Sequence, residues 1–289
     1  MKKIISIALA LLMVAVMLPV MAMADETLQS KINNATSGET IKLDKNYTED
    51  ITIPAGKAIT LDLDTFTLTG SSSHTITNNG TLTVVGTGKV VNNVTSKGTL
   101  FNNVNAIANL NGGTFEGTTW YVIKNLGTIT MSGASVTQND AGSSAIDNGW
   151  YGNPGNDCNV THPGNGYTAK LTIANGNFSG GMNTVKNDDY GVLEISGGTF
   201  SNTDGPTVLN WNVTTISGGE FTVNNGASSV IANGSFNNEA DKGQLTITGG
   251  QFTSSDNGNG NLLGYGVGGQ NGGCSPGTSL YFPRRKGSP

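Results

Sequence analysis

The hydrophobic and polar positions of this chain repeat, because a motif of an apolar residue, a spacer and an asparagine recurs seven times. The asparagines are Asn78, Asn103, Asn125, Asn148, Asn187, Asn210 and Asn233. Their successive spacings are 25, 22, 23, 39, 23 and 23 residues, a period of about 23 with one interruption. A period in this range is typical of stacked solenoid coils.

A second motif, Gly-Gly-x-Phe or a degraded copy, closes the strand-like run that follows most of these asparagines. Its final residues are Phe115, Val136, Phe178, Phe200, Phe221 and Phe252, at spacings of 21, 42, 22, 21 and 31. Both series stretch in the same coil, so we expect an insertion of about 17 to 20 residues between Asn148 and Leu171. A smaller insertion is expected between Asn233 and Gln244.

The segment from Thr184 to Phe200 shows how one coil is built. Alternation places Val185, Leu193 and Ile195 on one face, and Lys186 and Glu194 on the other. Coils stacked at the inter-strand distance of about 4.8 Å pair as parallel sheets around an apolar column. The sequence therefore predicts an all-β fold, a parallel β-helix (β-solenoid) of about eight to ten coils.

The seven asparagines would then lie at equivalent turns. Aligned amides can bond to one another along the stack and to backbone groups that the bend leaves open. The alternative is that asparagine simply suits turns. Either interpretation gives these residues a structural role.

The first residues indicate export. Residues 1–24 have the pattern of a secretory signal peptide, with two lysines, an apolar run and small residues before a cleavage site expected after Ala24. The apolar run is shorter than the roughly 20 residues of a membrane-spanning helix. We therefore expect a secreted or surface-located chain with no membrane span after cleavage.

The rest of the chain divides into three segments. Residues 25–40 are expected to form a cap with a short amphipathic helix, because Leu28 and Ile32 are four residues apart. Residues 41–268 carry the β-helix pattern. Residues 269–289 lose it and are expected to form an irregular tail.

The entry segment ETLQSKINNATSGETIKLDKNYTEDITIPAGKAITLDLDTFTLTG, followed by the coils, resembles the pectin-lyase-like superfamily of right-handed parallel β-helices. More narrowly, it resembles secreted or surface-attached β-helix proteins of gut Gram-positive bacteria. The resemblance covers roughly residues 25–268 and implies a right-handed coil. It leaves function open, because the superfamily includes polysaccharide lyases, glycoside hydrolases, phage tailspikes and non-catalytic adhesin-like proteins.

The net charge bears on possible partners, and the cysteines bear on a disulfide or a zinc site. Without residues 1–24 the chain has 13 basic and 20 acidic residues, a net charge of −7, which excludes nucleic acid as a partner. Cys158 and Cys274 are expected to remain unpaired, with a disulfide as the alternative. Together with His74 and His162 they do not make a zinc signature.

Five charged residues are candidates for catalysis. Lys124, Asp147 and Lys186 share one position in successive coils and should form an outward row, near the acidic pair Asp188 and Asp189. The lyases of the superfamily imply an Arg or Lys base, and no arginine precedes Arg284. The hydrolases imply clustered acids with a nearby His and an Arg-x-Lys pair, which the coils lack. The structural alternatives are a row of alternating charges and a solvated acidic turn.

No metal or other cofactor is expected, although calcium is an alternative. Its candidate ligands are Asp147, Asp157, Asp188 and Asp189. Calcium takes six to eight oxygen ligands, and loops supply backbone carbonyls readily. The chain has no DxDxDG loop that would specify such a site.

Aromatic residues follow the aligned asparagines in three consecutive coils. Trp150 and Tyr151, then Tyr190, then Trp211 occupy these positions, and Trp120 and Tyr121 lie nearby. Stacked rings beside Asp and Asn side chains suit sugar rings. The alternative is that they cover the turn edge or support the insertion.

These observations favour an exported, non-catalytic β-helix that binds carbohydrate or a host or cell-surface glycan, in the manner of an adhesin. A polysaccharide lyase or glycoside hydrolase is the competing class. A third candidate is a structural spacer domain of a longer cell-surface protein.

Overall fold

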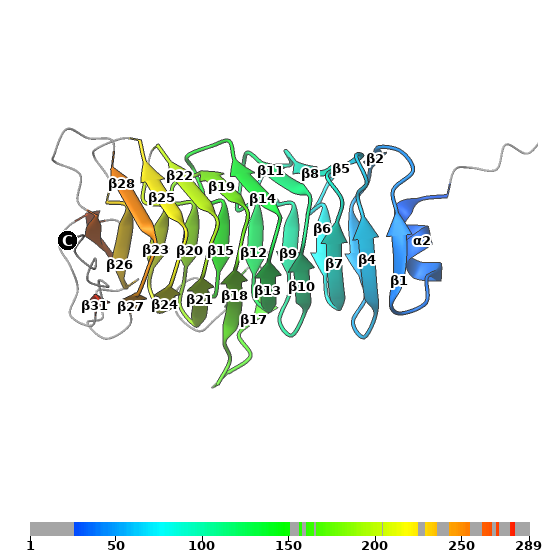
Figure 1. Cartoon of the computed structure of the whole chain (residues 1–289). Helices are drawn as coiled ribbons and strands as arrows, with labels where there is room; N and C mark the ends of the chain where they lie inside the picture. The colour runs from blue at the N-terminus through cyan, green and yellow to red at the C-terminus, as the bar shows by residue number, and fades with distance from the viewer. Residues whose placement is uncertain are drawn as a thin grey trace, which may run out of the picture.

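The structure is a computed structural model that describes residues 26–150, 156–157, 160–164, 166–203, 205–224, 229–235, 243–254, 262–267, 270–271 and 278–280. The predicted signal peptide, Tyr151 and both cysteines lie outside these residues. The described coils form one elongated stack, and each coil gives one strand to each of three parallel sheets (Figure 1). The predicted all-β parallel β-helix is confirmed. The three sheets contain ten, nine and nine strands in parallel pairing, which agrees with the expected number of coils, and one further strand of the third sheet is antiparallel to its neighbour.

The sheets, named A, B and C here, are continuous along the stack. Sheet A contains β1 (Glu39–Lys42), β4 (Ala58–Asp62), β7 (Thr81–Val85), β10 (Ile107–Leu110), β13 (Thr128–Met131), β18 (Ala169–Ile173), β21 (Gly191–Ile195), β24 (Val213–Ile216), β27 (Gln244–Ile247) and β31 (Thr278–Leu280). Sheet B contains β2 (Tyr47–Thr48), β5 (Thr67–Thr69), β8 (Lys89–Asn92), β11 (Thr114–Gly117), β14 (Ser135–Gln138), β19 (Asn177–Gly180), β22 (Thr199–Asn202), β25 (Glu220–Val223) and β28 (Gln251–Ser254). Sheet C contains β3 (Ile51–Ile53), β6 (Ile76–Asn78), β9 (Leu100–Asn102), β12 (Ile123–Asn125), β15 (Ile146–Asn148), β20 (Val185–Asn187), β23 (Val208–Asn210), β26 (Ile231–Ser235), β29 (Leu263–Val267) and β30 (Gln270–Asn271).

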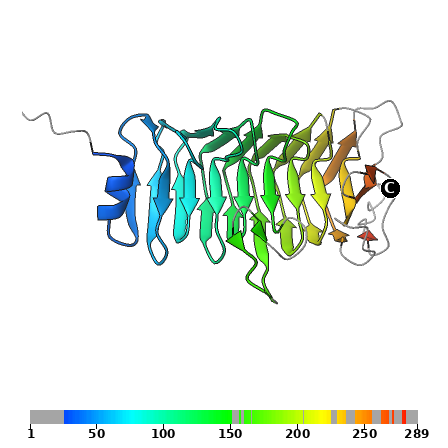
Figure 2. The same ribbon diagram turned by 180° about the vertical axis from the view of Figure 1, so that it is seen from behind.

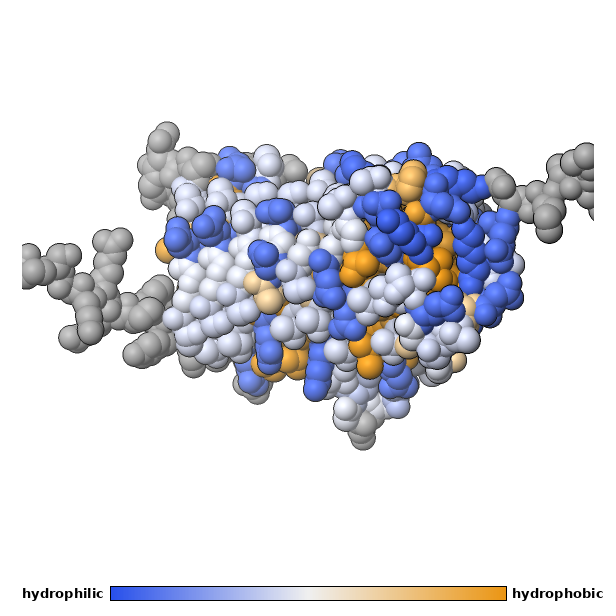
Figure 3. Space-filling model, turned by 45° about the vertical axis from the view of Figure 1, so that its right-hand side comes forward, coloured by the Kyte–Doolittle hydropathy of each residue, from blue (hydrophilic) through white to orange (hydrophobic). Residues whose placement is uncertain are grey.

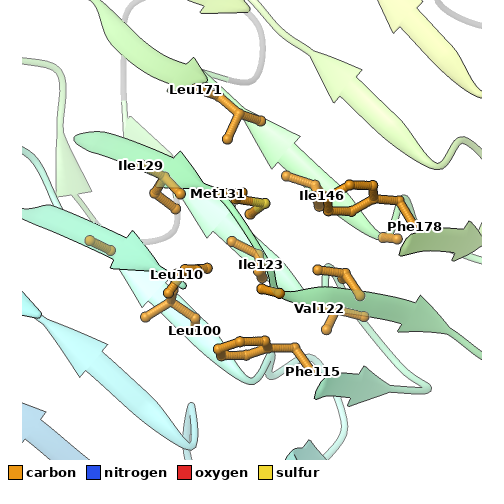
Figure 4. Packing of buried hydrophobic residues seen from close by; sticks show 14 of the residues in the cluster. Leu100, Leu110, Phe115, Val122, Ile123, Ile129, Met131, Ile146, Leu171 and Phe178 are labelled. Atoms are coloured by element: carbon orange, nitrogen blue, oxygen red, sulfur yellow. The ribbon is translucent and has the colours of Figure 1, made fainter. Parts of the chain in front are cut away.

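The core is the apolar column that the alternation predicts. Val185, Leu193 and Ile195 are buried and belong to one continuous cluster that runs the length of the stack. Figure 4 shows how side chains of the three sheets meet inside it, with Phe115 and Phe178 entering from sheet B. Each coil buries its apolar row against its neighbours, so stability comes from stacking rather than from any single coil.

The corner between sheets A and B explains the Gly-Gly-x-Phe motif. A Cβ on Gly197 would lie 2.3 Å from the carbonyl oxygen of Ala174 in the preceding coil, and Gly198 has a φ of +99°, which favours glycine. The phenylalanines that follow stack face to face, with 4.6 Å between the ring centroids of Phe200 and Phe221. The motif therefore combines a tight bend with a column of rings.

The corner between sheets B and C has a different residue pattern. At the end of the sheet B strand, six successive coils carry Gly70, Asn92, Gly117, Gln138, Gly180 and Asn202, so glycine and a buried amide alternate. The amide of Asn202 donates to the carbonyls of Gly180 and Gly181 at 3.1 and 3.0 Å. A Cβ on Gly70 would lie 2.5 Å from the side-chain nitrogen of Asn92 in the next coil. Glycine in one coil thus makes room for its amide-bearing neighbours.

The predicted cap is a seven-residue helix, α2 (Leu28–Asn34), at the N-terminal end of the stack (Figure 1). Leu28 and Ile32 are fully buried, as the i, i+4 spacing predicts. Among the described residues, no helix is long and apolar enough to cross a membrane.

The long insertion leaves the stack between β15 and β18. It contains the antiparallel pair β16 (Asn156–Asp157) and β17 (Val160–Thr161), and Figures 1 and 2 show it projecting from one side of the coils. At the other end, β30 and β31 fall within residues 269–289, so strand pairing extends beyond the boundary predicted at residue 268.

Candidate functional site

The candidate catalytic residues lie on the outer face of sheet C. Strand pairing aligns Phe101, Lys124, Asp147, Lys186 and Leu209 at the same position of five successive strands. The predicted row of Lys124, Asp147 and Lys186 is therefore present. Its signs alternate, as expected for charges on neighbouring strands.

The row lies on the outer face of the sheet, as predicted, but it is not exposed to solvent. Lys124 and Asp147 have no solvent exposure, and Lys186 is 5% exposed. Asp188 and Asp189 are buried as well, so they do not form a solvated turn. The reason is that a second hydrophobic cluster, formed partly by the insertion, covers this stretch of the sheet.

The buried charges are paired with one another. Lys124 Nζ contacts Asp147 Oδ2, and Lys186 Nζ lies 4.0 Å from Asp147 Oδ1. Lys186 Nζ also donates to Asp188 Oδ2 at 2.7 Å. Burial raises the pKa of the Asp188 carboxyl to about 7, against the lowering effect of Lys186. The site is thus a compact buried ion network with one carboxyl that titrates near neutrality.

A tight turn brings the second acid pair to this network. The Asp188 amide donates to the Asn148 carbonyl at 2.7 Å, and Tyr190 has a φ of +61°, an uncommon backbone state for an aromatic residue. The Trp150 amide donates to the Asp189 carbonyl at 2.6 Å, which ties the start of the insertion to this turn. These contacts hold the insertion against the outer face of sheet C.

Trp150 does not present a sugar-binding face. It is fully buried, and its ring makes edge contacts with His162 and Tyr167 at centroid distances of 4.8 and 5.8 Å. Tyr190 packs on His162 at 4.4 Å and keeps part of its surface exposed. Here the aromatic residues support the insertion, which was the alternative to sugar binding.

A second group of rings lies one to two coils away. His74 stacks on Phe101 at 5.1 Å and packs on Trp120 at 5.0 Å, and Trp120 packs on Tyr121 at 4.9 Å. Burial, with a further contribution from the charge of Lys97, lowers the pKa of His74 to about 4. His74, Trp120 and Tyr121 are only half-buried, so this group remains accessible to a ligand.

Aromatic rings also cover both lysines. The Tyr121 ring lies 5.5 Å from Lys124 Nζ, and the Trp211 ring lies 4.2 Å from Lys186 Nζ. Trp211 is buried in this position, so its predicted role in sugar binding is not supported. Tyr151, the remaining predicted aromatic, lies outside the described residues.

The row of asparagines is confirmed with one correction. In each consecutive pair the side-chain amide donates to the next side-chain oxygen at 2.7 to 2.9 Å, through Asn78, Asn102, Asn125, Asn148, Asn187, Asn210 and Asn233. Asn102 takes the place predicted for Asn103, because Asn102 is the residue paired with Asn78 and Asn125. Asn103 bonds instead to Asn79 at 3.0 Å on the adjoining turn.

The described residues offer few ligands for a metal cation. Among the described residues, no three His, Cys, Asp or Glu side chains gather in a group that could hold a metal ion. The oxygens of Asp147 and Asp188 face lysine ammonium groups. The Asp157 side chain lies outside the described part, so the calcium site remains a prediction.

Two members of the site were missed by reasoning from the sequence. Phe101 continues the charged row into the apolar cluster, and His74, which lies in the turn before β6, stacks on it from the preceding coil. Phe101 was missed because the asparagine series was aligned on Asn103, which shifts this coil by one residue. Counting from Asn102 instead would have placed it in line with Lys124.

A surface hollow lies away from these residues. A shallow groove of about 590 Å³ runs over the Gly-Gly corners of sheets A and B. Its lining residues are Asn175, Gly197, Gly198, Thr199, Gly218, Gly219, Glu220, Gly250 and Gln251. None of them is aromatic, and the groove owes its shape to the glycines that the bend requires. We therefore interpret it as a consequence of the coil geometry.

Comparisons of the chain with family models, with curated proteins and with solved structures find no match.

Proposed function

We propose that this protein is an exported, non-catalytic β-helix that recognises carbohydrate on a cell or host surface. The observation that carries the proposal is the burial of Lys124, Asp147, Lys186, Asp188 and Asp189 in mutual contacts. A general acid or base has to come within hydrogen-bond reach of its substrate. A polymer lying along the coils meets the covering aromatic cluster before it meets these groups.

The accessible rings of His74, Trp120 and Tyr121 support recognition of a sugar. Half-exposed aromatic faces can stack on the CH faces of sugar rings. The face of the molecule in Figure 3 is mainly hydrophilic or neutral, with hydrophobic residues in small patches, which suits a soluble display surface. The resemblance to adhesin-like members of the pectin-lyase-like superfamily points the same way.

The test compares two tryptophans on one glycan array. Trp120→Ala should weaken binding to a captured glycan with a small change in melting temperature, because Trp120 is half-buried. Trp150→Ala should lower stability by about 3 to 5 kcal/mol, because Trp150 is fully buried. Undiminished binding by a folded Trp120→Ala protein would overturn this assignment of the surface.

A polysaccharide-degradation assay on the same preparation tests the competing class. Turnover that disappears in Asp147→Asn would establish an enzyme and overturn the proposal. Neither binding nor turnover across the array would favour the spacer domain.

A further inference from the structure

Lys124 and Asp147 form an unusual buried contact. They are directly paired across the neighbouring parallel strands β12 and β15, and neither side chain has any solvent exposure. Taking two charges out of water is costly, and their attraction often fails to offset that cost. In such surroundings the neutral pair, an amine beside a carboxylic acid, becomes competitive with the ion pair.

The neighbouring residues Lys186 and Asp188 make the Asp147 carboxyl group more electrophilic. Lys186 Nζ lies 4.0 Å from Asp147 Oδ1 on the side away from Lys124, so its positive charge draws electron density from this carboxyl group. Lys186 also bridges to Asp188, at 2.7 Å. Asp188 therefore acts on the Asp147 carboxyl through Lys186, because its contact holds the Lys186 ammonium beside Asp147 Oδ1.

Water has little access to this place. The Tyr121 ring covers Lys124, the Trp211 ring covers Lys186, and Trp150 is fully buried nearby in the second hydrophobic cluster with Leu126. A dry site favours condensation over hydrolysis because the released water leaves. It also holds the reacting atoms in contact before any reaction begins.

We propose that Lys124 and Asp147 condense into an intramolecular isopeptide bond that links adjacent coils. A proton first passes from the Lys124 ammonium to the Asp147 carboxylate, which gives the neutral pair. The Nζ lone pair then adds to Cγ of Asp147. Nζ passes one proton to the departing hydroxyl, which leaves as water, while Lys186, held in place by Asp188, faces the charge that develops on Oδ1. One amide bond forms and one C–O bond breaks.

The same molecule contains a matched comparison. Lys89 Nζ lies 2.7 Å from Glu116 Oε1 across the neighbouring strands β8 and β11, but these side chains are 51% and 28% exposed. Water stabilises both charges there, so we expect this pair to remain unreacted. This inference does not depend on carbohydrate recognition, and its test is independent of any glycan.

The test is the intact mass of the mature, reduced protein. We expect a mass lower than the sequence mass by one water molecule. Trypsin should leave residues 98–170 as one peptide, uncut after Lys124 and lighter by one water, because a lysine whose Nζ is in an amide bond is not cleaved. A full sequence mass would overturn the proposal. Loss of water with the link mapped to another pair would overturn it as well.

Variants test the roles of the individual residues. Lys124→Arg and Asp147→Ala should each restore the full mass, whereas Lys89→Arg should keep the loss of one water. Asp188→Asn should slow the loss of water during refolding of the freshly denatured, newly made chain by tenfold or more. An unchanged rate would remove Asp188 as the positioning residue. Intact mass does not depend on folding, so a poorly folded variant still leaves the wild-type result decisive.

Discussion

At the residue scale, the buried asparagines make the coils equivalent to one another. Each side-chain amide has two N–H donors and one acceptor, which serve the next asparagine and a backbone carbonyl. Asn187 is typical, because its Nδ2 donates to Asn210 Oδ1 at 2.9 Å and to the Gly191 carbonyl at 3.0 Å, while its Oδ1 accepts from Asn148. One residue per coil thus satisfies groups that the bend takes out of the sheets.

Replacing Asn187 should therefore be costly. Asn187→Ala removes the bond that the Asn148 amide makes within the row, so this amide keeps only the Val192 carbonyl at 3.2 Å. It also removes one of the two amide donors to the Gly191 carbonyl. We expect a total loss of about 1 to 3 kcal/mol in the free energy of unfolding, measured as a shift in the denaturation midpoint. Asn177→Ala, at an exposed position of β19, is the control and should change little. Equal midpoints for the two variants would contradict the importance of the row.

The residues of the core were predictable and those of the site only in part. Alternation identifies Val185, Leu193 and Ile195 as buried because one face of a strand packs on the column. The same reasoning places Lys186 on the outer face of the sheet, which is correct. It does not predict that this side chain is buried. What covers an outer face depends on where an aperiodic insertion folds, and periodicity holds no information about that.

At the scale of elements, the capping helix is fixed by charges at both ends. Glu49 accepts from the amides of Leu28 and Gln29 at 2.7 and 3.2 Å, at the start of α2. Lys57 donates to the carbonyls of Ile32, Asn33 and Ala35 at 2.8 to 2.9 Å, at its end. A negative charge at the start of a helix complements its unsatisfied N–H groups, and a positive charge at its end complements its unsatisfied carbonyls. A helix this short owes its stability to such contacts and to the burial of Leu28 and Ile32.

Lys57 should matter more than an ordinary surface lysine. Lys57→Ala leaves three carbonyls without a donor, and we expect α2 to loosen with a loss of about 1 to 2 kcal/mol. Faster hydrogen exchange at the α2 amides, with little change in the distant coils, would show this. Lys42→Ala removes an exposed ion pair with Asp64 and serves as the control. Equal hydrogen-exchange protection of the α2 amides in the two variants would contradict the stabilising role of Lys57.

At the scale of the whole molecule, the register of every coil depends on its neighbours. The sheets pair residue by residue, as in the match of Leu171 with Leu193 and of Ile173 with Ile195. A shift of one residue would turn a buried row outward, whereas added length in a loop costs little. Stability is therefore sensitive to where a length change occurs.

A single inserted alanine makes this measurable. Placed after Glu194 in β21, it should cost more than about 4 kcal/mol or prevent folding, because Ile195 leaves the core position. Placed between Ala141 and Gly142, in an exposed turn, it should cost about 1 kcal/mol or less. Denaturant midpoints of the two proteins provide the comparison. Similar midpoints would refute the register.

The alternation of glycine and amide between sheets B and C sets a longer period than the coil itself. From Gly70 to Asn202 the corner repeats every two coils, although the asparagine row repeats every one. A chain that gained or lost one coil here would place two amides against each other, or two glycines beside an unfilled space. Adding or removing two coils would keep glycine and amide residues alternating at this corner. The coils that follow carry Val223 and Ser254 at this position and escape the rule, so this protein should tolerate single-coil changes in length most readily towards its C-terminal end.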